Sequence, residues 1–130
     1  MKLLKCRKLQ RNNIKQAGVL RPPDLVIRSE DKTMVKHIIL WKLKDEYNND
    51  KVKTGIKEGL EGLLGVIPGL VEIKVQTEKL ESSNVDVMLY SVFESADALR
   101  GYAVHPEHVK VADTKVRPFT ATRACIDFEE

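Results

Sequence analysis

Hydrophobic and polar positions alternate along four stretches of the chain and recur at helical spacing in two others, in the order β-α-β-β-α-β. This order is typical of an α+β, ferredoxin-like fold, in which an antiparallel sheet has helices on one face. The expected strands are residues 35–44, 70–80, 85–93 and 120–128.

Two helices are expected between these strands. Apolar residues at helical spacing over 52–67 predict the first helix, which Pro68 and Gly69 end. Its glycines recur every three or four residues and so lie near one another on the helix. Either they allow another part of the chain to pack closely against this helix, or the packing of the fold merely tolerates their low helix propensity. Ser95 is a good N-cap for the second helix, which Pro106 breaks. The glycines of the first predicted helix are Gly55, Gly59, Gly62 and Gly65.

The strands over 35–44 and 85–93 carry apolar residues on both faces, so both faces of the sheet need cover. Exposing a few hundred Å² of apolar surface costs several kcal/mol at about 25 cal/mol per Å². The helices cover one face, and a second copy of the chain is the simplest cover for the other. We therefore expect a homodimer. In the last strand, Ala124, Ile126 and Phe128 are expected to point inward.

The composition is that of a globular protein, with 42% hydrophobic and 32% charged residues among 130. No apolar run approaches the roughly 20 residues that span a bilayer, so no membrane association is expected. The two cysteines form neither a disulfide framework nor a metal-knuckle spacing, which favours a cytoplasmic setting. The net charge of +3 divides into about +6 over residues 1–33 and −3 over 34–130, which argues against nucleic-acid binding by the latter.

Two segments are predicted from this charge division. Residues 1–33 are expected to be a basic, disordered extension upstream of a natural start at Met34, with a transit peptide or a nucleic-acid-binding arm as alternatives. Residues 34–130 are expected to form the folded domain.

Candidate chemistry is concentrated in residues 99–108, which hold Tyr102 and two of the three histidines. His108 is a candidate general base or acid, and the Tyr102 phenol can hydrogen-bond a developing enolate. A structural role for both at a helix break is the alternative. His105 precedes a proline and is expected to cap the next helix. Neither a metal site nor a cofactor is expected, because no third ligand accompanies His105 and His108.

Other residues are assigned to the interior. His37 lies in the first strand and is expected to line a pocket, with Trp41 and Phe93 as further pocket wall or core. Cys125 is expected to be a small buried hydrophobe.

Several short motifs in fixed order resemble the Dabb family of stress-responsive dimeric α/β-barrel domains. The resemblance covers residues 34–128 and implies a ferredoxin-like protomer whose sheet joins that of its twin. It also supports Met34 as the natural start. The matching motifs are Val35-Lys36-His37-Ile38-Ile39-Leu40, Ile67-Pro68-Gly69, Val92-Phe93-Glu94-Ser95 and Tyr102-Ala103-Val104-His105-Pro106-Glu107-His108.

The resemblance also implies roles for three residues. In a plant polyketide cyclase of that family, the residues matching Tyr102 and His108 form the catalytic pair, and the residue matching His37 lines the pocket. This chain departs from that cyclase at Val87, where the cyclase carries another pocket histidine. The resemblance therefore does not imply that this chain acts on the same substrate as that cyclase.

Three functions remain open at this stage. The first is a stress-responsive protein that binds a small apolar or carbonyl-containing molecule in a cavity bordered by His37, Tyr102 and His108. The second is a cofactor-free cyclase, lyase or isomerase that uses the tyrosine and the histidine. The third is a structural stress protein without catalysis. The identity of the ligand and the presence of catalysis do not follow from the sequence.

Overall fold

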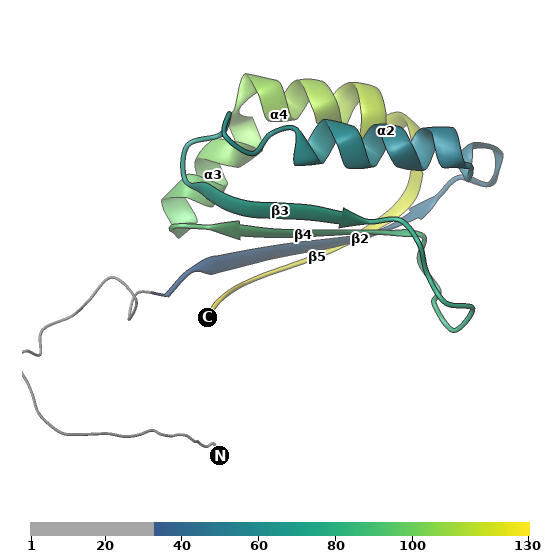
Figure 1. The fold of residues 1–130 in the computed structure, drawn as a ribbon, viewed down its shortest axis with the longest axis horizontal. Helices are drawn as coiled ribbons and strands as arrows, with labels where there is room; N and C mark the ends of the chain where they lie inside the picture. The colour runs from purple at the N-terminus through teal and green to yellow at the C-terminus, as the bar shows by residue number, and fades with distance from the viewer. Residues whose placement is uncertain (1–32) are drawn as a thin grey trace, which may run out of the picture. The chain divides into compact units, whose positions relative to one another are not determined.

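A four-stranded antiparallel sheet with helices on one face forms the part of the chain, residues 33–130, that the computed structural model describes (Figure 1). The strand order is β3-β4-β2-β5, which confirms the expected ferredoxin-like α+β fold. The basic extension predicted for residues 1–33 lies outside the described residues, except for Thr33. The elements are β2 (Val35–Leu43), η3 (Asp45–Tyr47), α2 (Asp50–Glu61), β3 (Leu70–Gln76), β4 (Val87–Phe93), α3 (Ala96–Val104), α4 (Pro106–Val111), η4 (Ala112–Val116), η5 (Arg117–Phe119) and β5 (Thr120–Glu129).

Strand β2 is central and pairs with β4 on one side and β5 on the other. Every second residue of β2, from Val35 to Leu43, is buried, because that face lies under the helices. Ile56 and Leu60 of α2 and Phe93 of β4 belong to the same core, each with at most 2% of its surface exposed. The alternation seen in the sequence therefore corresponds to the helix-covered face.

Helix α2 ends earlier than the sequence predicts. It stops at Glu61 with Gly62 as its C-cap, and Gly65 then adopts a φ of 87°, a conformation that favours glycine. A close neighbour exists for Gly59, because a Cβ there would lie 2.9 Å from Val111 of α4. Gly59 alone of the four glycines thus allows a close approach of α4 to α2, since a Cβ at Gly65 would have no atom within 4 Å.

The break between α3 and α4 follows the prediction. The Ser95 side chain accepts a hydrogen bond from the Ala98 N–H at 3.0 Å and caps α3. His105 Nδ1 accepts one from the Glu107 N–H at 3.1 Å and caps α4, whose first residue is Pro106. The expected capping role of His105 is confirmed.

Strand β3 is shorter than predicted and stops at Gln76, so Leu80 lies outside it with 78% of its surface exposed. The following loop is held by Asp86, whose buried carboxylate accepts hydrogen bonds from the Leu43 N–H at 2.8 Å and Lys79 Nζ at 2.7 Å. Burial alone would raise the pKa of Asp86, but these two donors outweigh it and lower the pKa.

The face assignment of β5 needs a correction. Ala124, Ile126 and Phe128 point away from the helices, and Ile126 is 59% exposed, because residues 125 and 127 pair opposite the helix-facing positions of β2. Cys125 is likewise exposed rather than buried. Among residues 33–130, no helix has the length and apolar character needed to cross a membrane.

Candidate functional site

A cavity of about 180 Å³ lies between the sheet and the segment from α3 to η5. Its walls come from the helix-facing side of β2 and β5 and from helices α3 and α4. The residues relevant to its chemistry are His37, Trp41, Leu99, Tyr102, His108 and Arg123.

Tyr102, on α3, is one polar group of this cavity. Its side chain is almost wholly buried, and its hydroxyl has no hydrogen-bond partner within residues 33–130. Burial raises the pKa of the Tyr102 phenol, and the positive charge of Arg123 opposes this only in part. The phenol therefore stays protonated at neutral pH and can donate a hydrogen bond.

His108, on α4, is the second polar group. Its ring lies against that of Tyr102 with centroids 4.0 Å apart, and its buried Nδ1 has no hydrogen-bond partner in the described part of the chain. Burial is the main cause that lowers the pKa of His108, and the nearby side chains of Arg117 and His37 lower it further through electrostatic interaction. These causes outweigh the Ala103 backbone and Asp113, which raise the pKa. His108 is therefore neutral at pH 7 and can accept a proton.

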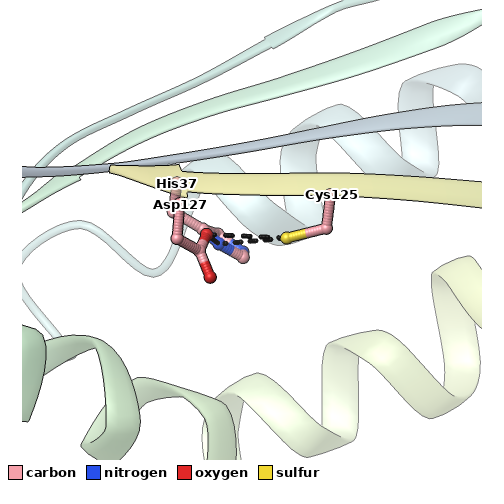
Figure 2. Close-up of side chains that lie close together, drawn as sticks. All are labelled: His37, Cys125 and Asp127. Carbon is pink, nitrogen blue, oxygen red and sulfur yellow. Dashed lines mark hydrogen bonds and ion pairs between the residues drawn. The ribbon is translucent and has the colours of Figure 1, made fainter. Parts of the chain in front are cut away.

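His37 borders the cavity from β2 and pairs with β5. Its Nδ1 lies 2.5 Å from Asp127 Oδ1, and its ring stands edge-on to Tyr102 with centroids 5.9 Å apart. Cys125 Sγ lies 3.8 Å from the same Nδ1 and 3.5 Å from Asp127 Oδ1. Figure 2 shows these three side chains together on the side of the sheet that faces the helices.

The residues nominated from the sequence lie in different places around the cavity. His37, Trp41, Tyr102 and His108 are on its walls. Phe93 is fully buried behind it and contacts the rings of His37 and Tyr102.

Sequence reasoning missed Asp127, Cys125 and Arg123 as neighbours of this region. The signal that could have found them is the alternation in β5, where these three residues share one face. Their proximity to His37 also requires the pairing of β2 with β5, which joins residues about 90 positions apart.

The arrangement pairs a hydrogen-bond donor with a proton acceptor at one cavity of a ferredoxin-like domain. The structure thus defines an α+β domain in which a tyrosine hydroxyl and a neutral imidazole border one cavity.

The chain belongs to the Dabb family, because the family model for the Stress responsive A/B Barrel Domain matches residues 35–130. This confirms the family inferred from the motifs.

Two curated relatives have similar sequences. A stress-response A/B barrel domain-containing protein from Arabidopsis thaliana is 28% identical over 96 residues, which cover 73% of this chain and 36% of that protein. The chain thus spans about a third of the length of this plant relative. Olivetolic acid cyclase from Cannabis sativa is 29% identical over 82 residues, which cover 61% of this chain and 80% of the cyclase.

The fold is also that of a solved structure, a dimeric protein with a ferredoxin-like fold from Bacteroides fragilis. The two chains are 35% identical and superpose with a TM-score of 0.68, over 75% of this chain and 96% of the other.

Proposed function

We propose that this protein binds a small carbonyl-containing molecule in the cavity between the sheet and helices α3 and α4. The observation that carries the proposal is the pair of buried polar atoms, Tyr102 Oη and His108 Nδ1, that have no hydrogen-bond partner within residues 33–130. A buried polar group left unpaired costs about 1–3 kcal/mol, so a ligand that pairs with these atoms gains this energy on binding.

The cavity volume sets the size of the ligand. A cavity of about 150 Å³ accommodates benzene. The roughly 180 Å³ available here therefore suits one ring with one or two small substituents. A carbonyl oxygen accepts the hydrogen bond that Tyr102 donates, and the apolar wall formed by Trp41 and Leu99 contacts the ring.

Calorimetric titration with benzoylacetone, which has one phenyl ring and two carbonyl groups, tests the binding proposal. We expect saturable binding that Tyr102→Phe weakens by about tenfold, the equivalent of one hydrogen bond of ~1.4 kcal/mol. His105→Asn is the matched control, because His105 caps α4 without lining the cavity. Absence of binding, together with an empty protein by native mass spectrometry after incubation in a metabolite extract, would favour the purely structural role.

A second function, cofactor-free carbonyl chemistry, is favoured by the protonation states of the same two residues. Neutral His108 takes the proton from a carbon between two carbonyls, and the electron pair moves onto a carbonyl oxygen that Tyr102 hydrogen-bonds. The resulting enolate carbon attacks a second carbonyl carbon, and the oxygen of that carbonyl takes up the proton that His108 removed, which returns His108 to its neutral form. The similarity to olivetolic acid cyclase supports this candidate for a cyclase, lyase or isomerase.

Exchange of the methylene protons of benzoylacetone for deuterium, followed by NMR, separates catalysis from binding. General-base catalysis should accelerate the exchange by at least about 10²-fold over buffer. We expect His108→Gln to remove this acceleration while His105→Gln keeps it. Binding with no acceleration by the wild-type protein would rule out the catalytic candidate and leave the binding proposal intact.

The proposal includes a homodimer in which a second copy covers the open face of the sheet. Leu40, Ile126 and Phe128 are exposed on this face, and the Bacteroides fragilis relative, described as dimeric, supports this assembly. Sedimentation equilibrium should give a dimer that Ile126→Lys dissociates and Val104→Lys, on the exposed end of α3, does not. A wild-type monomer would contradict this assembly. The cytoplasmic location that we propose rests on the cysteine content.

A further inference from the structure

His37, Cys125 and Asp127 form the one group of three or more potential metal ligands that converges within residues 33–130 (Figure 2). We propose that these three side chains bind a divalent cation of the zinc class. The site would use one imidazole nitrogen, one thiolate and one carboxylate oxygen, and these donor atoms lie within 4.8 Å of one another.

The strands already place the donors close to coordination geometry. Cys125 and Asp127 are two residues apart on β5 and so share a face, and Asp127 pairs directly with His37 of β2. All three side chains therefore project from a paired antiparallel ladder, which fixes their Cα positions more firmly than a loop would.

The distances between donor atoms test the fit. Tetrahedral zinc with bond lengths of about 2.0–2.3 Å separates a sulfur from a nitrogen or oxygen ligand by about 3.6 Å, and a nitrogen from an oxygen by about 3.4 Å. The sulfur lies 3.8 Å from His37 Nδ1 and 3.5 Å from Asp127 Oδ1, so both of its distances match.

The remaining distance requires one local movement. His37 Nδ1 and Asp127 Oδ1 are 2.5 Å apart, so they must separate by about 0.9 Å when a cation replaces the hydrogen bond between them. The Asp127 side chain is 45% exposed and can rotate, whereas the His37 ring is nearly buried and stays in place. The cost is therefore one carboxylate rotation rather than a backbone shift.

The donor set and its surroundings favour zinc over calcium or magnesium. Sulfur and imidazole ligands suit zinc-class cations, whereas calcium and magnesium take oxygen ligands. A thiolate and a carboxylate together neutralise a divalent cation, and the positive charges of Arg123 and Arg100, which line the same groove, oppose its binding.

An open fourth position follows from the location of the site. The three residues line a groove of about 510 Å³ between β5 and α3, and His37 also lines the main cavity. Three protein ligands with an open fourth position are characteristic of zinc sites that hold a water molecule or an anionic oxygen. The cation would therefore lie beside the cavity with an open coordination position, unlike a structural zinc ion with four protein ligands.

Cobalt absorption tests the site in the full-length, reduced protein after treatment with a chelator. We expect Co²⁺ to produce a thiolate-to-cobalt charge-transfer band, with one ion per chain, that Zn²⁺ displaces. Cys125→Ser should abolish the band and weaken Zn²⁺ binding in calorimetry by more than the roughly 10–100-fold that loss of even an outer-shell partner costs. Cys6→Ser, the other cysteine, is the matched control and should keep the band.

Further variants keep the test decisive. Asp127→Asn should weaken Zn²⁺ binding, whereas Asp113→Asn, which removes an exposed carboxylate paired with Arg117, should not. Circular dichroism confirms that each variant folds, and Asp127→Asn carries the test if Cys125→Ser does not fold. The proposal is overturned if wild-type protein gives no charge-transfer band, or if the band persists in Cys125→Ser.

Discussion

Replacing Gly69 by alanine is expected to destabilise the protein and to displace the helix that carries Tyr102. Gly69 precedes β3 with a φ of 81°, and its carbonyl accepts a hydrogen bond from the Glu94 N–H at 2.9 Å. A Cβ added at this position would lie 2.5 Å from the Cβ of Ala98 in α3. Carbon atoms in contact normally lie about 3.5–4.0 Å apart, so α3 would have to move by roughly 1 Å.

Two terms contribute to the magnitude. The left-handed backbone conformation costs a non-glycine residue about 1–2 kcal/mol, and overpacking against Ala98 adds about 1–3 kcal/mol. Gly65 isolates the first term, because it has a similar φ of 87° but no atom within 4 Å of the added Cβ. Gly65→Ala should therefore lose about 1–2 kcal/mol in the free energy of unfolding, and Gly69→Ala about 2–5 kcal/mol.

Urea unfolding of both variants measures these losses, and adding Ala98→Gly to Gly69→Ala should recover the packing part. Gly69→Ala should also weaken benzoylacetone binding, whereas Gly65→Ala should not, because only the former displaces α3. Equal destabilisation of the two variants, or no rescue by Ala98→Gly, would refute the close approach of α3 to Gly69.

Four further predictions concern three other positions. NMR titration should give His108 a pKa below 6.5, because burial disfavours its charged form. The free energy of unfolding should therefore fall as the pH drops from 6.5 towards the folded-state pKa. A titration midpoint of His108 at or above 6.5 would contradict this. Asp86→Ala should cost about 1–3 kcal/mol in urea unfolding, because the buried Leu43 N–H loses its acceptor. Since the pKa of Asp86 is lowered on folding, its stabilisation in the wild type should be present above pH 3.8 and be lost as the pH falls through the folded-state pKa; a pH-independent contribution would contradict this. Gly101→Ala, exposed and unhindered in α3, should raise the thermal midpoint by the equivalent of up to about 1 kcal/mol, and a lower midpoint would show a neighbour at this position.

Local patterns in the sequence were sufficient to predict most of the fold. The alternation over 35–44 identified β2 and its buried face, and Ser95 and Pro106 marked the helix starts, because capping and helix breaking depend on neighbouring residues. The end of β3 at Gln76 was not predictable in this way. It is accompanied by a loop that Asp86 holds to β2, a contact between distant parts of the chain.

The residues of the candidate site differ in the same way, since some follow from local sequence and others depend on contacts between distant parts of the chain. Tyr102 and His108 were nominated from one short segment, because both belong to consecutive helices and lie six residues apart. The proximity of Asp127 and Cys125 to His37 was not predicted, because it depends on the register between β2 and β5. The apolar residues of β5 were expected to point inward, whereas it is the polar residues of β5 that lie on the side of the sheet facing the helices.

This inverted polarity of β5 separates the two proposed interactions of the domain. A shift of one residue in register would bring Ile126 under the helices and move Cys125 and Asp127 to the open face, which would remove the contact with His37. The observed register instead leaves the apolar side chains for a second copy and the polar ones for the groove beside the cavity. Ile126→Lys should therefore dissociate the dimer while the protein keeps its cobalt absorption, and Asp127→Asn should weaken metal binding while the protein stays dimeric.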